Sequence, residues 1–357
     1  MERRKTRQVT IGLVKIGRGA PIAVQTMTNT DTADVVATLS QVGRIREAGA
    51  EIVRVSVNTA EAAKALPDII AGAGLPVVAD IHFRAELALQ ALQAGAQGLR
   101  INPGNIGSEA KVRDIAREAA ARGVPIRVGV NAGSLEKDLL DKYGHPTPQA
   151  LVESALKEIK LLEDTGFQDI KVSVKSSSVL ETVEAYQLLA GACDYPLHIG
   201  VSEAGTRWTG AIKSGVGLGI LLYQGIGDTI RVSLAADPVD EVRAAFAILK
   251  SLGLSERGPD IIACPTCART GIDVAGLAAA LEEALAPCEK SFKVAVMGCE
   301  VNGPGEAREA DLGIAGGKDR GLLFRRGEEV AWYPKEQLLA VLLEEIEKMY
   351  GEGCVGR

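Results

Sequence analysis

The sequence predicts an α/β fold: an N-terminal (β/α)8 TIM-type barrel followed by a smaller α+β domain. A short strand rich in valine and isoleucine, followed by an amphipathic helix, recurs eight times before residue 255. Several of these helices end in a glycine just before the next strand, at Gly49, Gly95, Gly123 and Gly166. A different pattern of strands and helices begins at residue 255. We therefore expect one domain at residues 1–254 and a second at 255–357.

The eight expected barrel strands are short and apolar. They cover residues 22–27, 52–57, 76–83, 98–102, 125–131, 169–175, 196–201 and 228–234. Helical stretches with apolar residues at three- and four-residue spacing follow them, as in 85–92. Eight right-handed units close a parallel barrel, whereas a doubly wound open sheet, the main alternative, would leave units unplaced.

An insertion at 134–148 interrupts the regular spacing after the fifth strand. In a barrel this insertion lies at the mouth, where it is either a functional loop or a plain surface excursion. The second domain is expected to contain two helices and five strands. In chain order they are strand 260–263, helix 272–285, strands 292–296, 311–315, 322–325 and 329–333, and helix 334–350.

Composition excludes several classes of function. The chain has 357 residues, 46% of them hydrophobic, and a net charge of -6, which argues against a basic nucleic-acid-binding surface. No apolar run is long enough to span a membrane. Six cysteines at irregular spacing indicate a reducing compartment, the cytoplasm, and use in metal or redox chemistry.

Three cysteines form the most informative pattern of the second domain. Cys264 and Cys267 are two residues apart, and Cys299 follows an expected strand in a turn of small residues. Three thiolates with a nearby carboxylate suit an iron–sulfur cluster that has one replaceable ligand. A CxxC pair also occurs in zinc sites and redox dithiols, although a zinc ribbon would need a second pair. Cys288 is a further candidate for the fourth ligand on spacing alone.

The remaining two cysteines are expected to have no ligand role. We expect Cys193 to pack as a small apolar side chain and Cys354, near the C-terminal end, to be a free thiol.

Basic residues recur on the expected barrel strands, where an unpaired polar side chain is costly to bury. They are Arg54, Arg100, Arg127, Lys171, Lys175 and Arg231. Such a lining on an acidic protein predicts a small anionic ligand, and arginine suits the oxygens of a diphosphate. Alternatively, one or two of them form structural ion pairs with Asp80, Glu203 or Asp237.

Four further residues near the ends of expected strands could transfer protons. These are Asp80, His82, His198 and Glu203, of which the two histidines could instead be hydrogen-bonded core residues. Glu203 lies among small residues at the end of the seventh strand, which leaves room for a ligand.

In these features the chain resembles the 4-hydroxy-3-methylbut-2-enyl diphosphate synthase family, the iron–sulfur enzymes of the methylerythritol phosphate route to isoprenoids. The most specific matching segment is Cys299-Glu-Val-Asn-Gly-Pro-Gly-Glu306. Other matching segments are 24–28, 79–83, 100–105, 129–135, 225–234 and 264–270. The resemblance covers nearly the whole chain in its compact, two-domain form.

The resemblance implies a [4Fe–4S] cluster held by Cys264, Cys267, Cys299 and Glu306. It implies reductive ring opening and dehydration of 2-C-methyl-D-erythritol 2,4-cyclodiphosphate. Loss of a hydroxyl as water requires a Lewis acid or a proton donor, so we expect Glu306, through an iron that it releases, and Glu203 as catalytic residues. The expected substrate-binding residues are Arg54, Arg100, Asn102, Arg127, Asn131, Lys175, His198, Arg231 and Ser233.

The resemblance also implies partners. A ferredoxin or a flavodoxin would supply electrons, and a head-to-tail homodimer would bring each cluster domain to the partner's barrel. The short segment 253–259 after the eighth helix favours that dimer, because it starts at the barrel face opposite the mouth. Two alternatives stay open: another barrel enzyme with a structural zinc domain, and an iron–sulfur sensor that is not an enzyme.

Overall fold

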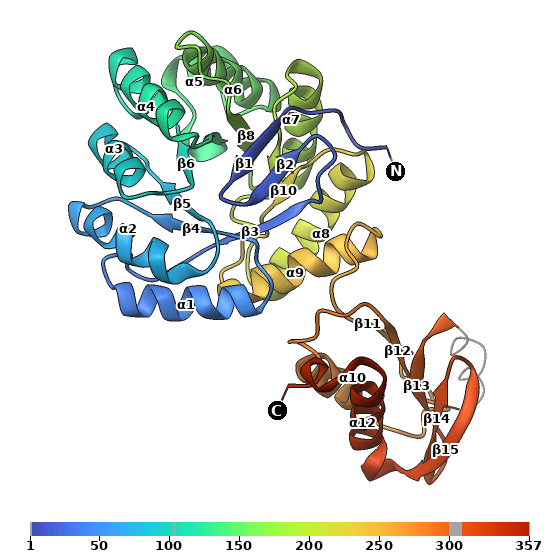
Figure 1. Cartoon of the computed structure of the whole chain (residues 1–357). Coiled ribbons are helices and arrows are strands. Elements are labelled where there is room, and N and C mark those ends of the chain that lie inside the picture. The colour runs from blue at the N-terminus through green and yellow to red at the C-terminus, as the bar shows by residue number, and fades with distance from the viewer. Residues whose placement is uncertain (1, 103–104, 300–308, 357) are drawn as a thin grey trace. The chain divides into compact units, whose positions relative to one another are not determined.

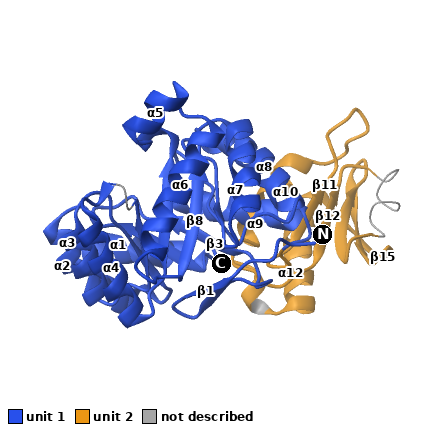
Figure 2. Ribbon diagram, turned by 90° about the horizontal axis from the view of Figure 1, so that it is seen from above, with its two compact units in different colours: residues 1–254 blue, residues 255–357 orange. Residues whose placement is uncertain are grey.

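The computed structural model describes residues 2–102, 105–299 and 309–356. The chain divides into two compact units, Met1–Leu254 and Ser255–Arg357 (Figure 2). Each unit has its own hydrophobic core. None of the helices in the described ranges is both long and apolar enough to cross a bilayer.

The first unit contains the predicted eight-stranded parallel barrel (Figure 1). Its strands are β3 (Ala23–Met27), β4 (Ile52–Ser56), β5 (Val77–Asp80), β6 (Gly98–Ile101), β7 (Ile126–Asn131), β8 (Ile170–Lys175), β9 (His198–Ile199) and β10 (Thr229–Ile230). Neighbouring strands follow chain order, β10 pairs with β3, and a parallel bridge between Val172 and Leu197 joins β8 to the β9 segment. The sheet therefore closes, and the open-sheet alternative is excluded.

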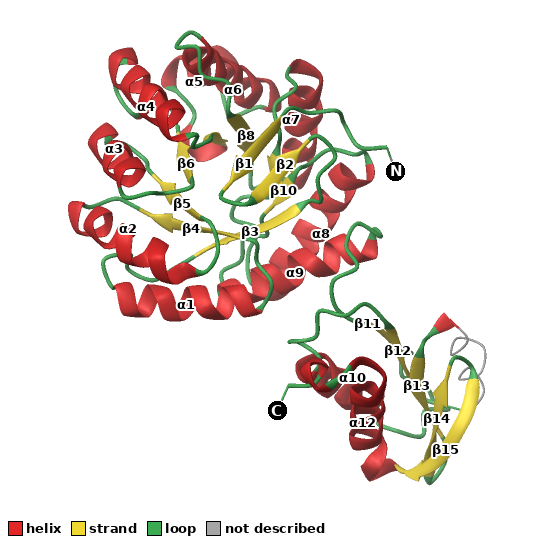
Figure 3. Cartoon of the chain, in the orientation of Figure 1, coloured by secondary structure: helices red, strands yellow, loops and turns green. Residues whose placement is uncertain are grey.

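A ring of helices surrounds the strands, as Figure 3 shows. These helices are α1 (Val35–Glu47), α2 (Ala60–Ala73), α3 (Ala85–Gln93), α4 (Glu109–Arg122), α6 (Pro148–Glu163), α7 (Val179–Ala192), α8 (Arg207–Tyr223) and α9 (Pro238–Ser251). Several helices begin at a residue whose side chain accepts a hydrogen bond from a backbone N–H of the first turn. These N–H groups have no acceptor within the helix, so the cap stabilises the helix start. The capping residues are Asp34, Thr59, Thr147, Ser178 and Asp237. The insertion forms a 3-10 turn, η2 (Ala132–Ser134), and the short helix α5 (Lys137–Tyr143).

A β-hairpin of β1 (Gln8–Ile11) and β2 (Val14–Gly17) precedes the barrel and was not predicted. In Figure 1 it lies across one opening of the strand ring. Val9, Ile11 and Ile16 pack there against Ile52 and Val78 at the start of barrel strands. The hairpin thus covers the N-terminal end of the barrel core with apolar side chains.

In its described ranges the second unit contains a five-stranded sheet and two helices. Its strands, in spatial order, are β11 (Asp260–Ala263), β12 (Lys293–Met297), β13 (Leu312–Gly316), β14 (Arg320–Arg325) and β15 (Glu328–Pro334). The first three are parallel, and the last two pair antiparallel. The helices α10 (Val274–Ala284) and α12 (Leu338–Tyr350) pack together on one face, and two 3-10 turns, η4 (Lys335–Gln337) and η5 (Glu352–Cys354), flank α12. The predicted elements all occur, with ends shifted by up to four residues; the largest shift is at the start of α12, where the 3-10 turn η4 precedes the helix.

The structure corrects the expectation for Cys354. It forms a disulfide with Cys288, 66 residues earlier in the chain, and both side chains are buried. Cys288 is therefore not a fourth cluster ligand in this arrangement, because its sulfur is bonded to another sulfur. Cys193 packs against the barrel core, as expected.

Candidate active site

The predicted basic residues meet inside the barrel because alternate side chains of a strand point to the same face. Arg54, Arg100, Arg127, Lys171 and Lys175 are all buried. In the strand register Arg100 stands opposite Arg127, and Arg127 stands opposite Lys171. Three neighbouring strands therefore bring three basic side chains to the same level of the barrel.

Two of these arginines share one carboxylate. Asp80, at the end of β5, pairs with Arg54 Nε at 3.3 Å and with Arg100 Nη1 at 3.2 Å. Burial alone would raise the pKa of Asp80, but the charges of Arg54 and Arg100 outweigh it and lower the pKa to about 2. Asp80 is thus ionised at neutral pH. It has no proton to donate, and both of its oxygens are paired with arginines, which disfavours the proton-transfer role considered from the sequence.

Two glycines leave room for the side chains of Arg100 and Lys175. Arg100 Nη2 donates to the backbone oxygen of Gly129 at 3.0 Å, and a Cβ on Gly129 would lie 2.6 Å from Arg100 Nε. A Cβ on Gly200 would likewise lie 2.6 Å from Lys175 Nζ. Because these two glycines have no Cβ, the basic side chains can pass over the neighbouring strands at these positions.

Arg127 and Lys175 lack a carboxylate partner among the ion pairs of the described ranges. Arg127 Nη1 donates to Ser173 Oγ at 2.6 Å, and its Nε has no hydrogen-bond partner in those ranges. Burial, followed by the charges of neighbouring cations, lowers the pKa of both side chains well below its usual value. An anion bound between Arg127 and Lys175 would offset both the cost of burying them and the repulsion between neighbouring positive charges. The two side chains therefore form a candidate anion site.

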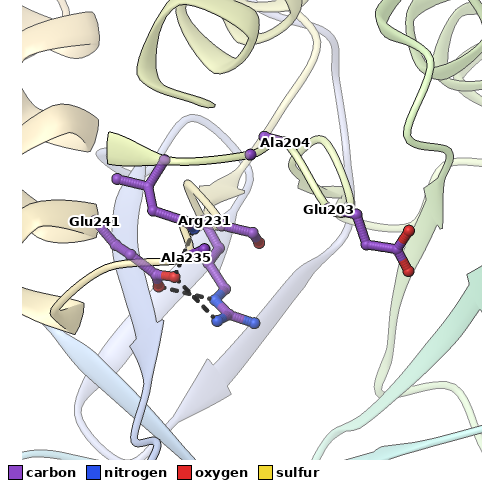
Figure 4. Close-up of a pocket in the computed structure, with 8 residues that line it drawn as sticks. Glu203, Ala204, Arg231, Ala235 and Glu241 are labelled. Carbon is purple, nitrogen blue, oxygen red and sulfur yellow. Dashed lines mark hydrogen bonds and ion pairs between the residues drawn. The ribbon is translucent and has the colours of Figure 1, made fainter. Parts of the chain in front are cut away.

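Arg231 has a partner that sequence reasoning missed. Glu241, in the first turn of α9, accepts from Arg231 Nε at 3.1 Å and from Nη2 at 3.3 Å (Figure 4). It also accepts from the hydroxyl of Thr26 at 2.6 Å. Three of the six basic residues are therefore paired, more than the one or two expected, with Asp80 and Glu241 as the acids. The only sequence signal for Glu241 was an acidic residue just inside a helix start.

A pocket of about 380 Å³ opens beside Arg231. Its lining includes Glu203, Ser233 and Glu241. Glu203 is exposed and has a φ of 49°, an uncommon backbone conformation for a residue other than glycine. In Figure 4 its carboxylate points away from the Arg231–Glu241 pair. The structure thus places Glu203 and Ser233 at one pocket and leaves the Glu203 carboxylate accessible.

His198 and Asn102 are buried and are not among the residues that line this pocket. His198 is fully buried, and its Nδ1 is 2.8 Å from Thr229 Oγ1. Burial, and then the nearby charges of Lys175 and Arg127, lower the pKa of His198 well below its usual value, so the ring is neutral. Asn102 is buried with its Oδ1 unpartnered in the described ranges, and Asn131 ends β7 beside Lys175.

The three predicted thiol ligands line a second pocket, in the second unit, of about 200 Å³. Cys264 follows β11 and Cys299 follows β12, and these parallel neighbours end at the same sheet edge. The backbone N–H of Gly298 donates to Cys264 Sγ at 3.0 Å. A hydrogen bond of this kind favours a thiolate.

A thiol-bound cluster suits the donors of this pocket, since Cys264, Cys267 and Cys299 all face it. The described ranges hold no group of three or more His, Cys, Asp or Glu side chains arranged to hold a metal ion as they stand. The fourth predicted ligand, Glu306, lies outside the described residues.

Comparison with known proteins covers both units. Residues 6–246 match the family described as GcpE TIM-barrel domain, and residues 260–348 match the GcpE protein C-terminal domain. A protein of Nitratidesulfovibrio vulgaris is 58% identical over 97% of this chain and 90% of its own length. One of Geobacter sulfurreducens is 56% identical over 98% of this chain and 99% of its own. Both are called 4-hydroxy-3-methylbut-2-en-1-yl diphosphate synthase (flavodoxin).

Solved structures support the barrel alone. An N-acetylneuraminic acid synthetase from Leptospira borgpetersenii aligns with a TM-score of 0.51 at 12% identity. It covers 71% of this chain and 92% of its own, and at that identity the likeness concerns only the fold.

Proposed function

Since the chain belongs to the GcpE family, we propose that it is a 4-hydroxy-3-methylbut-2-enyl diphosphate synthase of isoprenoid precursor biosynthesis. It converts 2-C-methyl-D-erythritol 2,4-cyclodiphosphate to 4-hydroxy-3-methylbut-2-enyl diphosphate. The reaction opens the ring at a carbon–oxygen bond and releases one hydroxyl as water, and it consumes two electrons and two protons. The observation that carries this proposal is the pair of buried cations, Arg127 and Lys175, that have no carboxylate partner in the described ranges.

The diphosphate is proposed to bind at the inner basic residues. Arg127 and Lys175 would contact phosphate oxygens directly, since neither forms an ion pair in the described ranges. Arg54 and Arg100 are held by Asp80 and still have donors to offer, because a guanidinium carries five N–H groups. Asn102, Asn131, His198, Arg231 and Ser233 complete the proposed set.

These cations would also promote ring opening. The oxygen that leaves carbon gains negative charge, and fixed buried donors stabilise that charge without reorganising. Glu203 is the proposed proton donor to the hydroxyl that leaves as water, since its carboxylate is accessible at the pocket. Asp80 is unsuited to this role because its pKa is about 2.

Cys264, Cys267 and Cys299, with Glu306, would hold a [4Fe–4S] cluster. A bound cluster supplies the electrons and an iron that acts as a Lewis acid. The N–H of Gly298 would stabilise the Cys264 thiolate. A flavodoxin is the electron donor that the relatives' names indicate. We propose the cytoplasm as the compartment, because thiol ligands must stay reduced.

A head-to-tail homodimer is proposed to combine the barrel of one chain with the thiol pocket of another. Helix α8 supports a self-association surface, because exposed apolar residues recur along it every three or four positions. They are Trp208, Ile212, Val216, Ile220 and Tyr223. Val216→Glu should dissociate the dimer in sedimentation, whereas the control Lys213→Glu, on the same helix, should not.

Mixing inactive chains tests the shared site. Cys299→Ser and Glu203→Gln chains that are each inactive should recover part of the activity after exchange, because one site of each heterodimer is intact. No recovery after proven chain exchange would contradict the shared site but not the activity itself.

The proposed activity has a direct test. Protein purified without oxygen should be brown and should convert the cyclodiphosphate when reduced flavodoxin is supplied. Cys299→Ser should be colourless and inactive under the same conditions. A colourless wild-type protein loaded with zinc would favour the structural zinc domain. A brown protein without turnover would favour a sensor.

A further inference from the structure

Lys171 is the basic residue of the barrel interior that the proposed function leaves without a role. It lies on β8 and is 2% exposed, and its Nζ has no hydrogen-bond partner within the described residues. An ammonium group carries three donors, so burying it without an acceptor is costly. A neutral amine loses far less on burial. The surroundings therefore favour the uncharged form of Lys171 in the free protein.

The nearest cations oppose a charge on Lys171. Arg127 on β7 stands opposite it in the strand register, and Arg54 on β4 also faces it. Burial first, and then the charges of Arg127 and Arg54, lower the pKa of Lys171 well below its usual value. His198 on β9 lies near as well, but it is a neutral ring.

The acids around Lys171 are already used elsewhere. Asp228, just before β10, is the carboxylate that attracts Lys171, yet it accepts from Arg3 and from the backbone N–H of Leu197. Asp80 on β5 pairs with two arginines. Lys175, four residues along β8, is a second buried basic side chain without a carboxylate partner in the described ranges, so it supplies no negative charge. The free barrel thus holds more potential cations than anions.

A bound diphosphate would reverse this balance. Each phosphorus of the cyclic diphosphate carries one ionised oxygen, so the ligand brings two negative charges. Coulomb attraction is weakly screened in a protein interior and acts across several ångströms. The repulsion from Arg127 would then be offset by the anion that Arg127 binds.

We propose that Lys171 is a positioning residue that is uncharged in the free barrel and takes up one proton when a diphosphate binds. The charged Lys171 would then support, from the deeper part of the barrel, the cations that contact the phosphates. The inference rests on the proposed function, because it takes the cyclodiphosphate as the ligand. Affinity for that ligand should consequently increase as the pH falls.

Calorimetry can count this proton. Holoenzyme without reductant binds the cyclodiphosphate and does not turn it over, and the ionised oxygens of this ligand do not titrate near neutral pH. The heat of binding at pH 8 is measured in HEPES and in Tris, which differ in their heats of protonation. Lys171→Met should take up about one proton fewer than wild type. The control Lys64→Met, on the exposed face of α2, should match wild type.

The pH dependence of the dissociation constant is a second measure of the proton uptake. For each proton taken up, the dissociation constant of wild type should rise up to tenfold between pH 7.5 and 8.5, and Lys171→Met should show a smaller rise. Equal proton uptake and equal slopes in both proteins would overturn the proposal. Absence of any cyclodiphosphate binding by wild type would instead contradict the proposed function.

If Lys171→Met no longer binds the cyclodiphosphate, the melting temperature of the free protein still tests the proposal. A lysine whose folded pKa is lowered destabilises the protein below its unfolded pKa, and that penalty fades as the pH rises. The variant should therefore melt above wild type at pH 7, and the difference should shrink toward pH 10. A difference that does not change with pH would show that Lys171 is charged in the free barrel.

Discussion

Replacing Asp80 by asparagine removes the one carboxylate that Arg54 and Arg100 share. The side chains remain similar in size, so the change acts through charge rather than packing. Both arginines are buried, and a guanidinium group keeps its charge at neutral pH. Two buried cations then repel each other without compensation. We expect Asp80→Asn to destabilise the barrel.

The size of this effect follows from the pKa of Asp80. Its fall from 3.8 to about 2 corresponds to roughly 2–3 kcal/mol of preference for the ionised form in the folded state. Removing one partner of a buried pair typically costs about 3–5 kcal/mol. Asparagine can still accept a hydrogen bond from an arginine. We therefore expect a loss of about 2–4 kcal/mol in the free energy of unfolding at pH 7.

Urea unfolding measures this loss, with the barrel transition identified as the one that the cyclodiphosphate shifts to higher urea. Because the folded pKa is lowered, the stability is present above pH 4 and is lost as the pH falls toward 2. The gap between wild type and Asp80→Asn should therefore narrow below pH 4. The control Asp114→Asn breaks an exposed ion pair with Arg117 and should cost less than about 0.5 kcal/mol. A similarly small loss for Asp80→Asn would refute the reasoning.

Three further predictions concern the proposed site. Arg127→Ala should weaken cyclodiphosphate binding by about 2–3 kcal/mol in calorimetry without lowering the stability of the fold, since Arg127 has no carboxylate partner in the described ranges; unchanged affinity with lowered stability would make it structural. Glu203→Gln should bind the substrate nearly normally and lose at least about 100-fold in kcat, whereas an equal loss in binding with normal chemistry would remove it from the catalytic residues. Cys267→Ser should lose the visible absorption of the cluster and Cys193→Ser should keep it; a bleached Cys193→Ser protein would contradict the ligand set.

Much of the site could be predicted because its signals are local. Basic residues within apolar strands indicate an anion site whichever strands pair, and the CxxC spacing predicts a common pocket for Cys264 and Cys267. Partners on other elements could not be predicted. Glu241 looks like an ordinary helix-start residue until α9 packs beside β10 and β3 and brings it to Arg231 and Thr26.

The sequence by itself determined the barrel and the second domain, because the spacing of apolar residues along each strand and helix indicates which face is buried. It also placed basic residues on the barrel strands, five of which the structure buries. The tertiary structure decided which of them are neutralised, since that depends on the strand register that sets Asp80 against Arg54 and Arg100. It likewise decided the hairpin over the barrel end and the Cys288–Cys354 disulfide. Contacts between residues far apart in the chain have no local period, so only the closed fold determines them.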